Sequence, residues 1–217
     1  MSYSLKSIII DPISKEKPES AVILCHGYGG DGKDISILAN YWKNYLPKTI
    51  FICPDAPEKC SISPSGFQWF ELGEHSEDQI LAKSLVSEAK LNKLIDEVKE
   101  KNNISADKIV LSGFSQGCMI SLQTGIKRKD KINCILGYSG RIISPNYLGK
   151  NINSRPNVML MHGDKDMVVP ITSLLEAKDF FNKNNYTIET KIFKNCEHRI
   201  PTEGSSIGLE FIKKNLY

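Results

Sequence analysis

The sequence predicts an α/β protein with a mostly parallel, doubly wound sheet that is flanked by helices on both faces. Short runs rich in Ile and Val alternate with longer stretches whose apolar residues recur at the helical period. The central runs are apolar at odd and even positions alike, as expected for strands covered on both faces. Strands that alternate with helices form βαβ units, which make neighbouring strands parallel. The predicted strands are 6–10, 21–25, 49–53, 108–111, 132–136, 157–161 and 187–193, and the predicted helices are 34–45, 78–101, 116–127, 171–182 and 202–215.

Length and composition fit a single domain over residues 1–217. The chain is 41% hydrophobic and 24% charged, as is ordinary for a globular protein. We find no internal repeat and no low-complexity linker that would divide it. Residues 54–77 form the one long irregular connection. Long loops in compact domains commonly serve as lids or binding loops, so this loop is predicted to lie near the substrate pocket.

Charge and hydropathy exclude several classes of partner. The net charge is only +3, without a block of like charges, so we expect no nucleic-acid partner. The first apolar run, Ile8 to Ile10, is too short for a signal peptide, and no later run approaches the roughly 18 residues of a membrane span. We therefore expect a cytoplasmic protein without a transmembrane segment. The six cysteines show no C-x-x-C or zinc spacing, which predicts reduced, mostly buried thiols and no metal.

The segment Gly113-Phe114-Ser115-Gln116-Gly117 matches the pattern G-x-S-x-G. A predicted strand runs into this segment and a predicted helix leaves it, which is the setting of a nucleophile elbow. The tight turn exposes the serine hydroxyl at the carboxyl end of a strand and directs a helix N-terminus at the reacting carbonyl. The pattern therefore predicts Ser115 as a catalytic nucleophile.

A serine nucleophile needs a base, and the base needs an orienting acid. On this kind of scaffold the chain order is serine, acid, histidine. His198 follows the last predicted strand and precedes the last helix, so it is the predicted base, whereas His162 is predicted to have a structural role at a strand end. Either Asp164 or Asp166 could orient the histidine; Asp164 is the better turn former, and Asp166 lies further out.

The oxyanion that forms during acyl transfer needs two N–H donors. One is predicted to be the backbone N–H of Gln116, directly after the nucleophile. The other is assigned to the backbone N–H of Tyr28, because the surrounding glycines let this loop approach a substrate closely. A phosphate-binding loop is the rival interpretation, but neither of the common glycine-rich phosphate motifs is present.

Together these motifs resemble the phospholipase/carboxylesterase family of small α/β-hydrolases, which includes acyl-protein thioesterases and bacterial carboxylesterases. The resemblance implies an α/β-hydrolase fold, a triad of Ser115, Asp166 and His198, and backbone donors at Tyr28 and Gln116. It also places Trp69 beside an acyl pocket. The chain departs from the family pattern at Cys118 and Glu197, and the second departure leaves the pH optimum open. The matching segments are LCHGYGGDGKDI (24–35), CPDAPEKC (53–60), FQWFEL (67–72), VLSGFSQGCM (110–119), HGDKDMVVP (162–170) and CEHRI (196–200).

The predicted reaction is two-step acyl transfer from an ester or thioester through an acyl-enzyme on Ser115, with activity rising as His198 loses its proton. No cofactor is required, and the partner is a small-molecule or acylated substrate. Ile62, Phe67 and Phe70 are predicted to line the acyl groove with Trp69. We expect a monomer or a weak homodimer.

Three other functions remain open from the sequence. A non-catalytic binding protein could retain the hydrolase shape, since fold does not determine function. A peptidase or amidase could use the same fold. A metal-dependent hydrolase would use His26, His162 and His198, although their sequence spacing is not typical of metal ligands.

Overall fold

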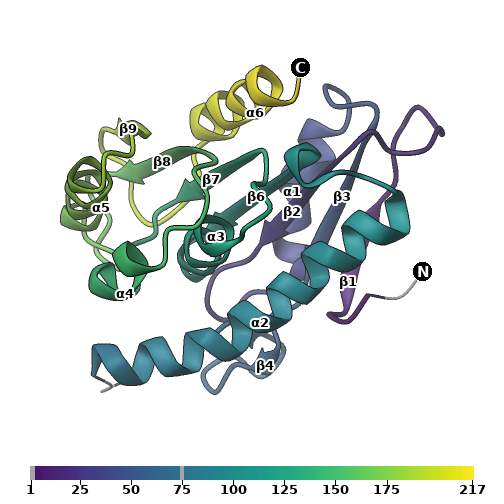
Figure 1. Ribbon diagram of the computed structural model, residues 1–217. Helices are drawn as coiled ribbons and strands as arrows, with labels where there is room; N and C mark the ends of the chain where they lie inside the picture. The colour runs from purple at the N-terminus through teal and green to yellow at the C-terminus, as the bar shows by residue number, and fades with distance from the viewer. Residues whose placement is uncertain (1–2, 74–75) are drawn as a thin grey trace.

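The computed structural model describes residues 3–73 and 76–217. Seven strands form the main sheet in the order β1-β3-β2-β6-β7-β8-β9 (Figure 1). Only β1 runs antiparallel to its neighbour; the other adjacent strands of this sheet are parallel. The strands are β1 (Ser7–Ile10), β2 (Ser20–Cys25), β3 (Thr49–Pro54), β6 (Ile109–Phe114), β7 (Cys134–Tyr138), β8 (Asn157–Gly163) and β9 (Glu189–Phe193).

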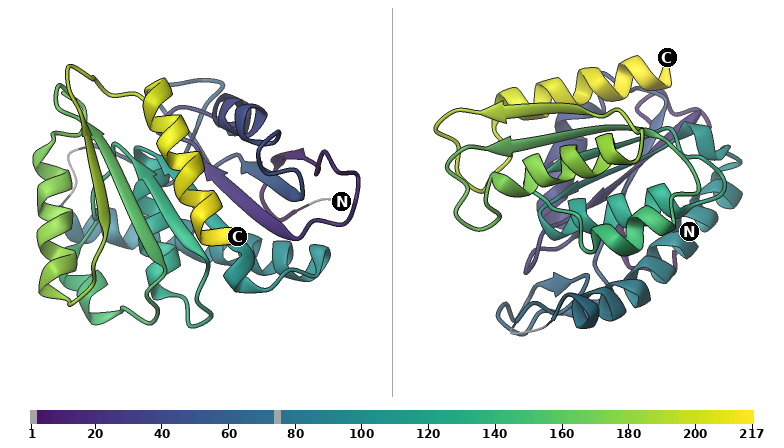
Figure 2. Two further views of the ribbon diagram at one scale, coloured as in Figure 1. Left: turned by 90° about the horizontal axis from the view of Figure 1, so that it is seen from above. Right: turned by 60° about the vertical axis from the view of Figure 1, so that its left-hand side comes forward.

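Helices cover both faces of this sheet, so the predicted α/β fold is confirmed (Figures 1 and 2). On β2, Val22 and Leu24 pack with α1 and α6, whereas Ile23 and Cys25 pack with α2, α3 and α5. This alternation explains why the strand is apolar at every position after its first. The helices are α1 (Gly32–Trp42), α2 (Glu77–Asn102), α3 (Gln116–Lys127), α4 (Pro145–Lys150), α5 (Thr172–Lys183) and α6 (Thr202–Leu216).

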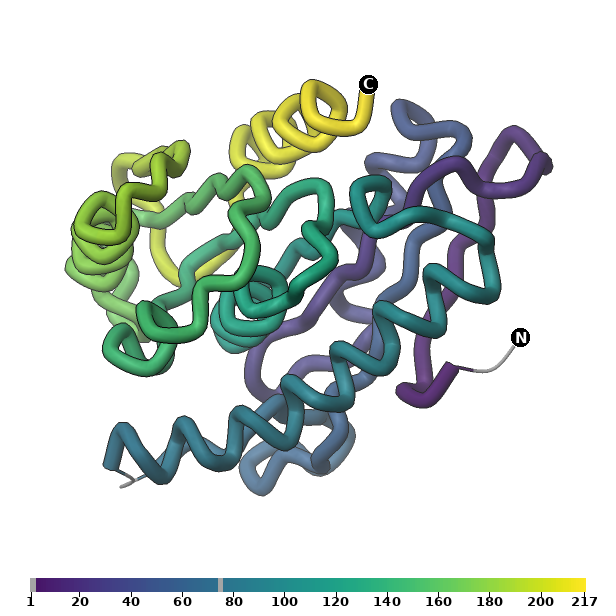
Figure 3. The backbone as a smooth tube through the Cα atoms, viewed as in Figure 1, coloured from purple at the N-terminus to yellow at the C-terminus, as the bar shows by residue number. Residues whose placement is uncertain are grey.

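Every strand and helix predicted from the sequence is present, with its ends shifted by at most three residues. Two features differ from the prediction. The connection 54–77 is not irregular throughout, because β4 (Glu58–Lys59) and β5 (Phe67–Gln68) form a small antiparallel hairpin beside α2 (Figure 3). Helix α4 was not predicted, because a helix of under two turns gives no periodic signal. Positions 74 and 75 of the connection lie outside the described residues.

The carboxyl ends of the parallel strands lie on the same side of the sheet, and ligands of open α/β folds bind at these ends. β6 leads directly into α3 through a turn at Ser115. A Cβ atom on Gly117 would lie 2.1 Å from the carbonyl oxygen of Cys25, so only glycine allows α3 to approach β2 this closely. A Cβ atom on Gly113 would lie 2.3 Å from the carbonyl oxygen of Gly117, so packing requires both glycines of the G-x-S-x-G segment.

All six cysteines are buried, and all have free thiols. Burial raises the pKa of the Cys25 and Cys118 thiols to about 12. These two groups therefore remain neutral thiols at physiological pH, as is typical of structural cysteines.

Candidate active site

Ser115 adopts a strained backbone conformation between β6 and α3. Its φ of 53° and ψ of −117° are unusual for a residue with a side chain. Its N–H donates a hydrogen bond to the carbonyl oxygen of Tyr138 at 2.8 Å, and this bond ties the turn to the end of β7. The hydroxyl makes no capping bond to α3. Strain of this kind persists at functional sites when the surrounding structure enforces it, and here it gives the geometry of a nucleophile elbow.

The His198 ring is held by the carboxylate of Asp166. Nδ1 of His198 and Oδ2 of Asp166 are 2.7 Å apart. Because an ionised carboxylate can only accept a hydrogen bond, Nδ1 carries the proton and Nε2 of the neutral ring carries the free electron pair. The arrangement therefore prepares Nε2 of His198 to act as a base.

The Asp166 carboxylate is itself fixed by backbone donors. The N–H groups of Val168 and Val169 donate to Oδ1 at 3.0 Å and 2.8 Å. Burial alone would raise the pKa of Asp166, but the hydrogen bonds from His198 and Val169 outweigh it and lower the pKa. Asp166 is thus ionised and well placed to stabilise a positively charged imidazolium.

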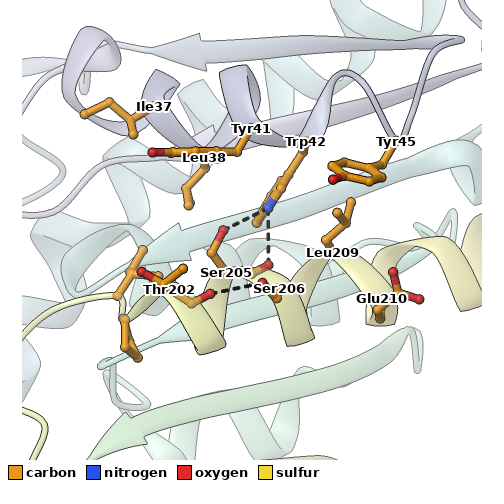
Figure 4. Close-up of a pocket in the computed structure, with 12 residues that line it drawn as sticks. Ile37, Leu38, Tyr41, Trp42, Tyr45, Thr202, Ser205, Ser206, Leu209 and Glu210 are labelled. Atoms are coloured by element: carbon orange, nitrogen blue, oxygen red, sulfur yellow. Dashed lines mark hydrogen bonds between the residues drawn. The ribbon is translucent and has the colours of Figure 1, made fainter.

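The ring of Phe114, directly before Ser115, packs against the His198 ring with the two centroids 4.7 Å apart. This contact brings the histidine to the elbow. On the other side, His198 is followed by α6, which is anchored to α1. There the Trp42 indole donates to the carbonyl and hydroxyl oxygens of Ser205 at 3.2 Å and 3.1 Å (Figure 4). The loop that carries His198 is therefore held at the histidine itself and by the helix that follows it.

The contacts in the structure distinguish Asp164 from Asp166 and His162 from His198. It is Asp166, and not Asp164, whose carboxylate meets His198. His162 lies behind the carboxylate, where its Nε2 hydrogen-bonds to the carbonyl oxygen of Val169 at 2.8 Å. Burial lowers the pKa of His162. The His162 ring therefore hydrogen-bonds to a backbone carbonyl group at the end of a strand, as expected for a histidine with a structural role.

The loop after β2 places Tyr28 beside the elbow. Gly29, in this loop, has a φ of +77°, a conformation that favours glycine. A Cβ atom on Gly27 would lie 3.4 Å from the Cβ of Ser115, so the loop and the elbow are in close contact. Among the described residues, the backbone N–H groups of Tyr28 and Gln116 donate to no protein acceptor. Both predicted oxyanion donors are therefore free to bind a substrate oxygen.

Comparison with known proteins identifies the family of this chain. The model of the phospholipase/carboxylesterase family matches residues 7–216. The chain belongs to this family.

Known proteins and solved structures that resemble this member of the family match it over nearly its whole length. It is 31% identical to acyl-protein thioesterase 1 of Saccharomyces cerevisiae over 212 residues, which cover 90% of this chain and 92% of the yeast protein. The crystal structure of esterase PE8 superposes with a TM-score of 0.92 at 30% identity, covering 98% and 99% of the two chains. Acyl-protein thioesterase 2 of Zea mays shares the fold, with a TM-score of 0.79 at 21% identity over 98% and 99%. The chain is thus a hydrolase with the α/β-hydrolase fold.

The four residues predicted to bind substrate differ in exposure in this structure. Trp69 and Phe70 are fully buried, Phe67 is partly buried beneath the ammonium group of Lys59, and Ile62 is 76% exposed. The structure therefore does not gather them on one open surface, and their role in substrate binding stays a prediction. A small cleft of about 230 Å³ lies beside the site and is lined in part by Tyr28, Ile35 and Phe114.

Sequence reasoning missed the contribution of two of these site residues. Ile35 sits on α1 and lines the small cleft. Phe114 lines the same cleft and also packs on the His198 ring. Phe114 occupies the variable position before the serine in G-x-S-x-G, so the pattern gives no signal for it. A larger cleft of about 440 Å³ lies between α1 and α6, and no predicted catalytic residue lines it (Figure 4).

His26 links two backbone segments of this structure. Nδ1 hydrogen-bonds to the carbonyl oxygen of Gly27 at 2.7 Å, and Nε2 accepts the N–H of Ala56 at 2.9 Å. Both nitrogens are thus engaged with backbone groups, which leaves none to bind a metal in the neutral ring. In the part of the chain that the structure describes, no group of three or more His, Cys, Asp or Glu side chains could hold a metal ion.

We expect the fold to lose stability as the pH decreases below about 6.5, the ordinary pKa of histidine. Burial lowers the pKa of His26, and protonation would break its bond to the Ala56 N–H. A folded-state pKa below the unfolded value means that the unfolded chain binds more protons. Stability present above the unfolded pKa is therefore lost as the pH falls. Urea unfolding at pH 7.5 and 5.5 measures this, and His26→Gln should show a smaller pH dependence. Equal dependence in the two proteins would show that His26 does not contribute.

Proposed function

We propose that this protein hydrolyses carboxylic esters or thioesters through an acyl-enzyme on Ser115. The observation that carries the proposal is the 2.7 Å hydrogen bond between Asp166 and His198. The His198 ring packs on Phe114, the residue directly before the strained Ser115. The Ser115, Asp166 and His198 side chains come from the connections that follow β6, β8 and β9. A buried ionised acid, an oriented imidazole and an elbow serine together form the constellation used by serine hydrolases on several unrelated folds.

The reaction proceeds in two steps. Nε2 of His198 removes the proton from the Ser115 hydroxyl while its oxygen attacks the substrate carbonyl, and Asp166 stabilises the resulting imidazolium. The N–H groups of Tyr28 and Gln116 bind the oxyanion. His198 then donates its proton to the leaving alcohol or thiol, which leaves an acylated Ser115. Water, activated by the same imidazole, attacks the acyl-enzyme and releases the carboxylic acid. None of these steps needs a metal or an organic cofactor.

The names of the relatives support an acylated substrate. Acyl-protein thioesterase 1 of Saccharomyces cerevisiae and esterase PE8 both resemble this chain over most of its length. We accordingly place the chain among the carboxylesterases and thioesterases, with a small acyl ester or an acylated protein as substrate. No helix in the described residues could cross a lipid bilayer. We further propose that the protein acts in the cytoplasm, as a monomer or a weak homodimer.

A fluorophosphonate probe, which phosphonylates activated serines, tests the proposal directly. We expect the wild-type protein to be labelled and Ser115→Ala to remain unlabelled. Ser112→Ala is the matched control, because Ser112 lies three residues away in β6 and its buried hydroxyl has no hydrogen-bond partner among the described residues. This control should label like the wild type.

Lack of labelling in a well-folded wild-type protein would contradict an activated Ser115. It would favour the alternative of a non-catalytic binding protein that retains the α/β-hydrolase shape. Labelling that persists in Ser115→Ala would place the nucleophile elsewhere. Circular dichroism on all three proteins shows whether each is folded.

A further inference from the structure

The two N–H groups proposed to bind the oxyanion come from segments that are far apart in the sequence. Tyr28 lies in the loop after β2, and Gln116 is the first residue of α3. β2 and β6 pair in parallel register as far as Cys25 and Gly113, so strand pairing sets the spacing of the two segments only below the site. Beyond these residues, other contacts must hold the two donors at a defined distance.

The segment 67–70 makes such contacts with the loop after β2. The N–H of Gly29 donates to the carbonyl oxygen of Phe67, and the N–H of Phe67 donates to the carbonyl oxygen of Gly30, both at 2.9 Å. The Trp69 indole donates to the carbonyl oxygen of His26 at 3.0 Å. The loop is thus bonded to this one segment both before and after Tyr28.

The same segment is bonded to the other donor residue through the side chain of Gln116. Oε1 of Gln116 accepts the N–H of Trp69 at 2.7 Å, and Nε2 donates to the carbonyl oxygen of Phe70 at 2.6 Å. The hydroxyl of Ser87, on α2, donates to the carbonyl oxygen of Trp69. A chain of hydrogen bonds therefore runs from the Tyr28 loop through segment 67–70 to the start of α3.

Burial makes this chain of bonds rigid. Gln116, Trp69 and Phe70 all have 0% of their surface exposed. Water cannot replace a bond that breaks there, so the buried amide would be left unsatisfied if it turned away. The acceptor end of the amide faces an N–H and its donor end faces a carbonyl, which defines a single orientation. The backbone N–H of the same residue is one of the two oxyanion donors.

We propose that the side chain of Gln116 is a positioning residue that sets the spacing of the two oxyanion donors through Trp69 and Phe70. The inference rests on the proposed function. Donors aimed at the oxyanion act mainly in the transition state, so a change in their spacing lowers kcat more than it raises KM. The fully buried Trp69 thus contributes to the reaction by holding the two donors in place.

The test compares Gln116→Met with the wild type on p-nitrophenyl butyrate. Met is similar in length to Gln but makes neither bond to segment 67–70. Removal of one oxyanion donor costs about a hundredfold to a thousandfold in kcat, and a displaced donor costs less. We expect kcat to fall by about tenfold or more while KM changes by less than about threefold. Rates are normalised to the folded fraction from circular dichroism.

Gln123→Met is the matched control. Gln123 lies on the same helix, is 4% exposed, and donates to Ser84 and Glu88 at 3.0 Å and 2.8 Å. Its substitution also breaks buried amide bonds, but away from the site, so we expect kcat to stay within about threefold of the wild type. If Gln116→Met does not fold, Gln116→Glu replaces it in the test, since Glu keeps an acceptor for the N–H of Trp69. This variant should still lower kcat more than it changes KM.

An unchanged kcat in the folded Gln116 variant, or an equal loss in Gln123→Met, would overturn the positioning role while leaving the proposed function intact. A different result, full turnover by Ser115→Ala, would overturn the proposed function and the inference with it. The two failures are distinguishable, because the activity of Ser115→Ala is measured without any Gln116 variant.

Discussion

Replacing His198 by Ala is expected to lower kcat for a p-nitrophenyl ester by about a millionfold, to near the limit of detection. Without the imidazole, no group removes the Ser115 proton or protonates the leaving group. His198 is partly exposed, with its side chain at 18%, so its truncation should have little effect on the folded structure. Steady-state kinetics on protein shown by circular dichroism to be folded measure the effect.

Two further variants make this prediction specific. The double variant Ser115→Ala/His198→Ala should be no slower than the single variants, because the two groups act as a unit. Glu197→Gln, which changes the exposed neighbour of His198, should keep kcat within about tenfold of the wild type. A His198→Ala protein that retains more than about 1% of wild-type kcat would identify another base.

Asp166→Asn is expected to lower kcat by about ten thousandfold. The amide of Asn can donate a hydrogen bond to Nδ1 of His198, which would place the ring proton on Nε2. That tautomer cannot accept the Ser115 proton. The backbone donors Val168 and Val169 can still bond the remaining oxygen, so the geometry should survive. Measurement of kcat on the folded variant gives the effect.

Asp164→Asn is the matched control, two residues away in the same loop. The N–H of Asp164 bonds the carbonyl oxygen of Phe193, and its Oδ1 has no partner in the described chain. The control should therefore retain kcat within about tenfold of the wild type. If Asp164→Asn were the slower variant, the geometric assignment of Asp166 as the orienting acid would be wrong.

The order of strands and helices was predictable because it depends on local patterns. Apolar runs such as 157–161 mark covered strands, and the elbow at Ser115 follows from the small residues two positions before and two positions after the serine. Helix α4 and the β4–β5 hairpin escaped prediction, because segments this short carry no periodicity.

The sequence by itself determined the fold class, the nucleophile elbow and the histidine in the final loop, because each is marked by a contiguous motif or by chain order. Only the tertiary structure shows that Asp166, and not Asp164, contacts His198, since both residues suit the loop and the contact depends on which carboxylate reaches the imidazole. It alone showed that Trp69 is buried and bonded to Gln116, 47 residues away. Hydrogen bonds between segments so distant in the chain leave no periodic trace, because folding brings their partners together only in space.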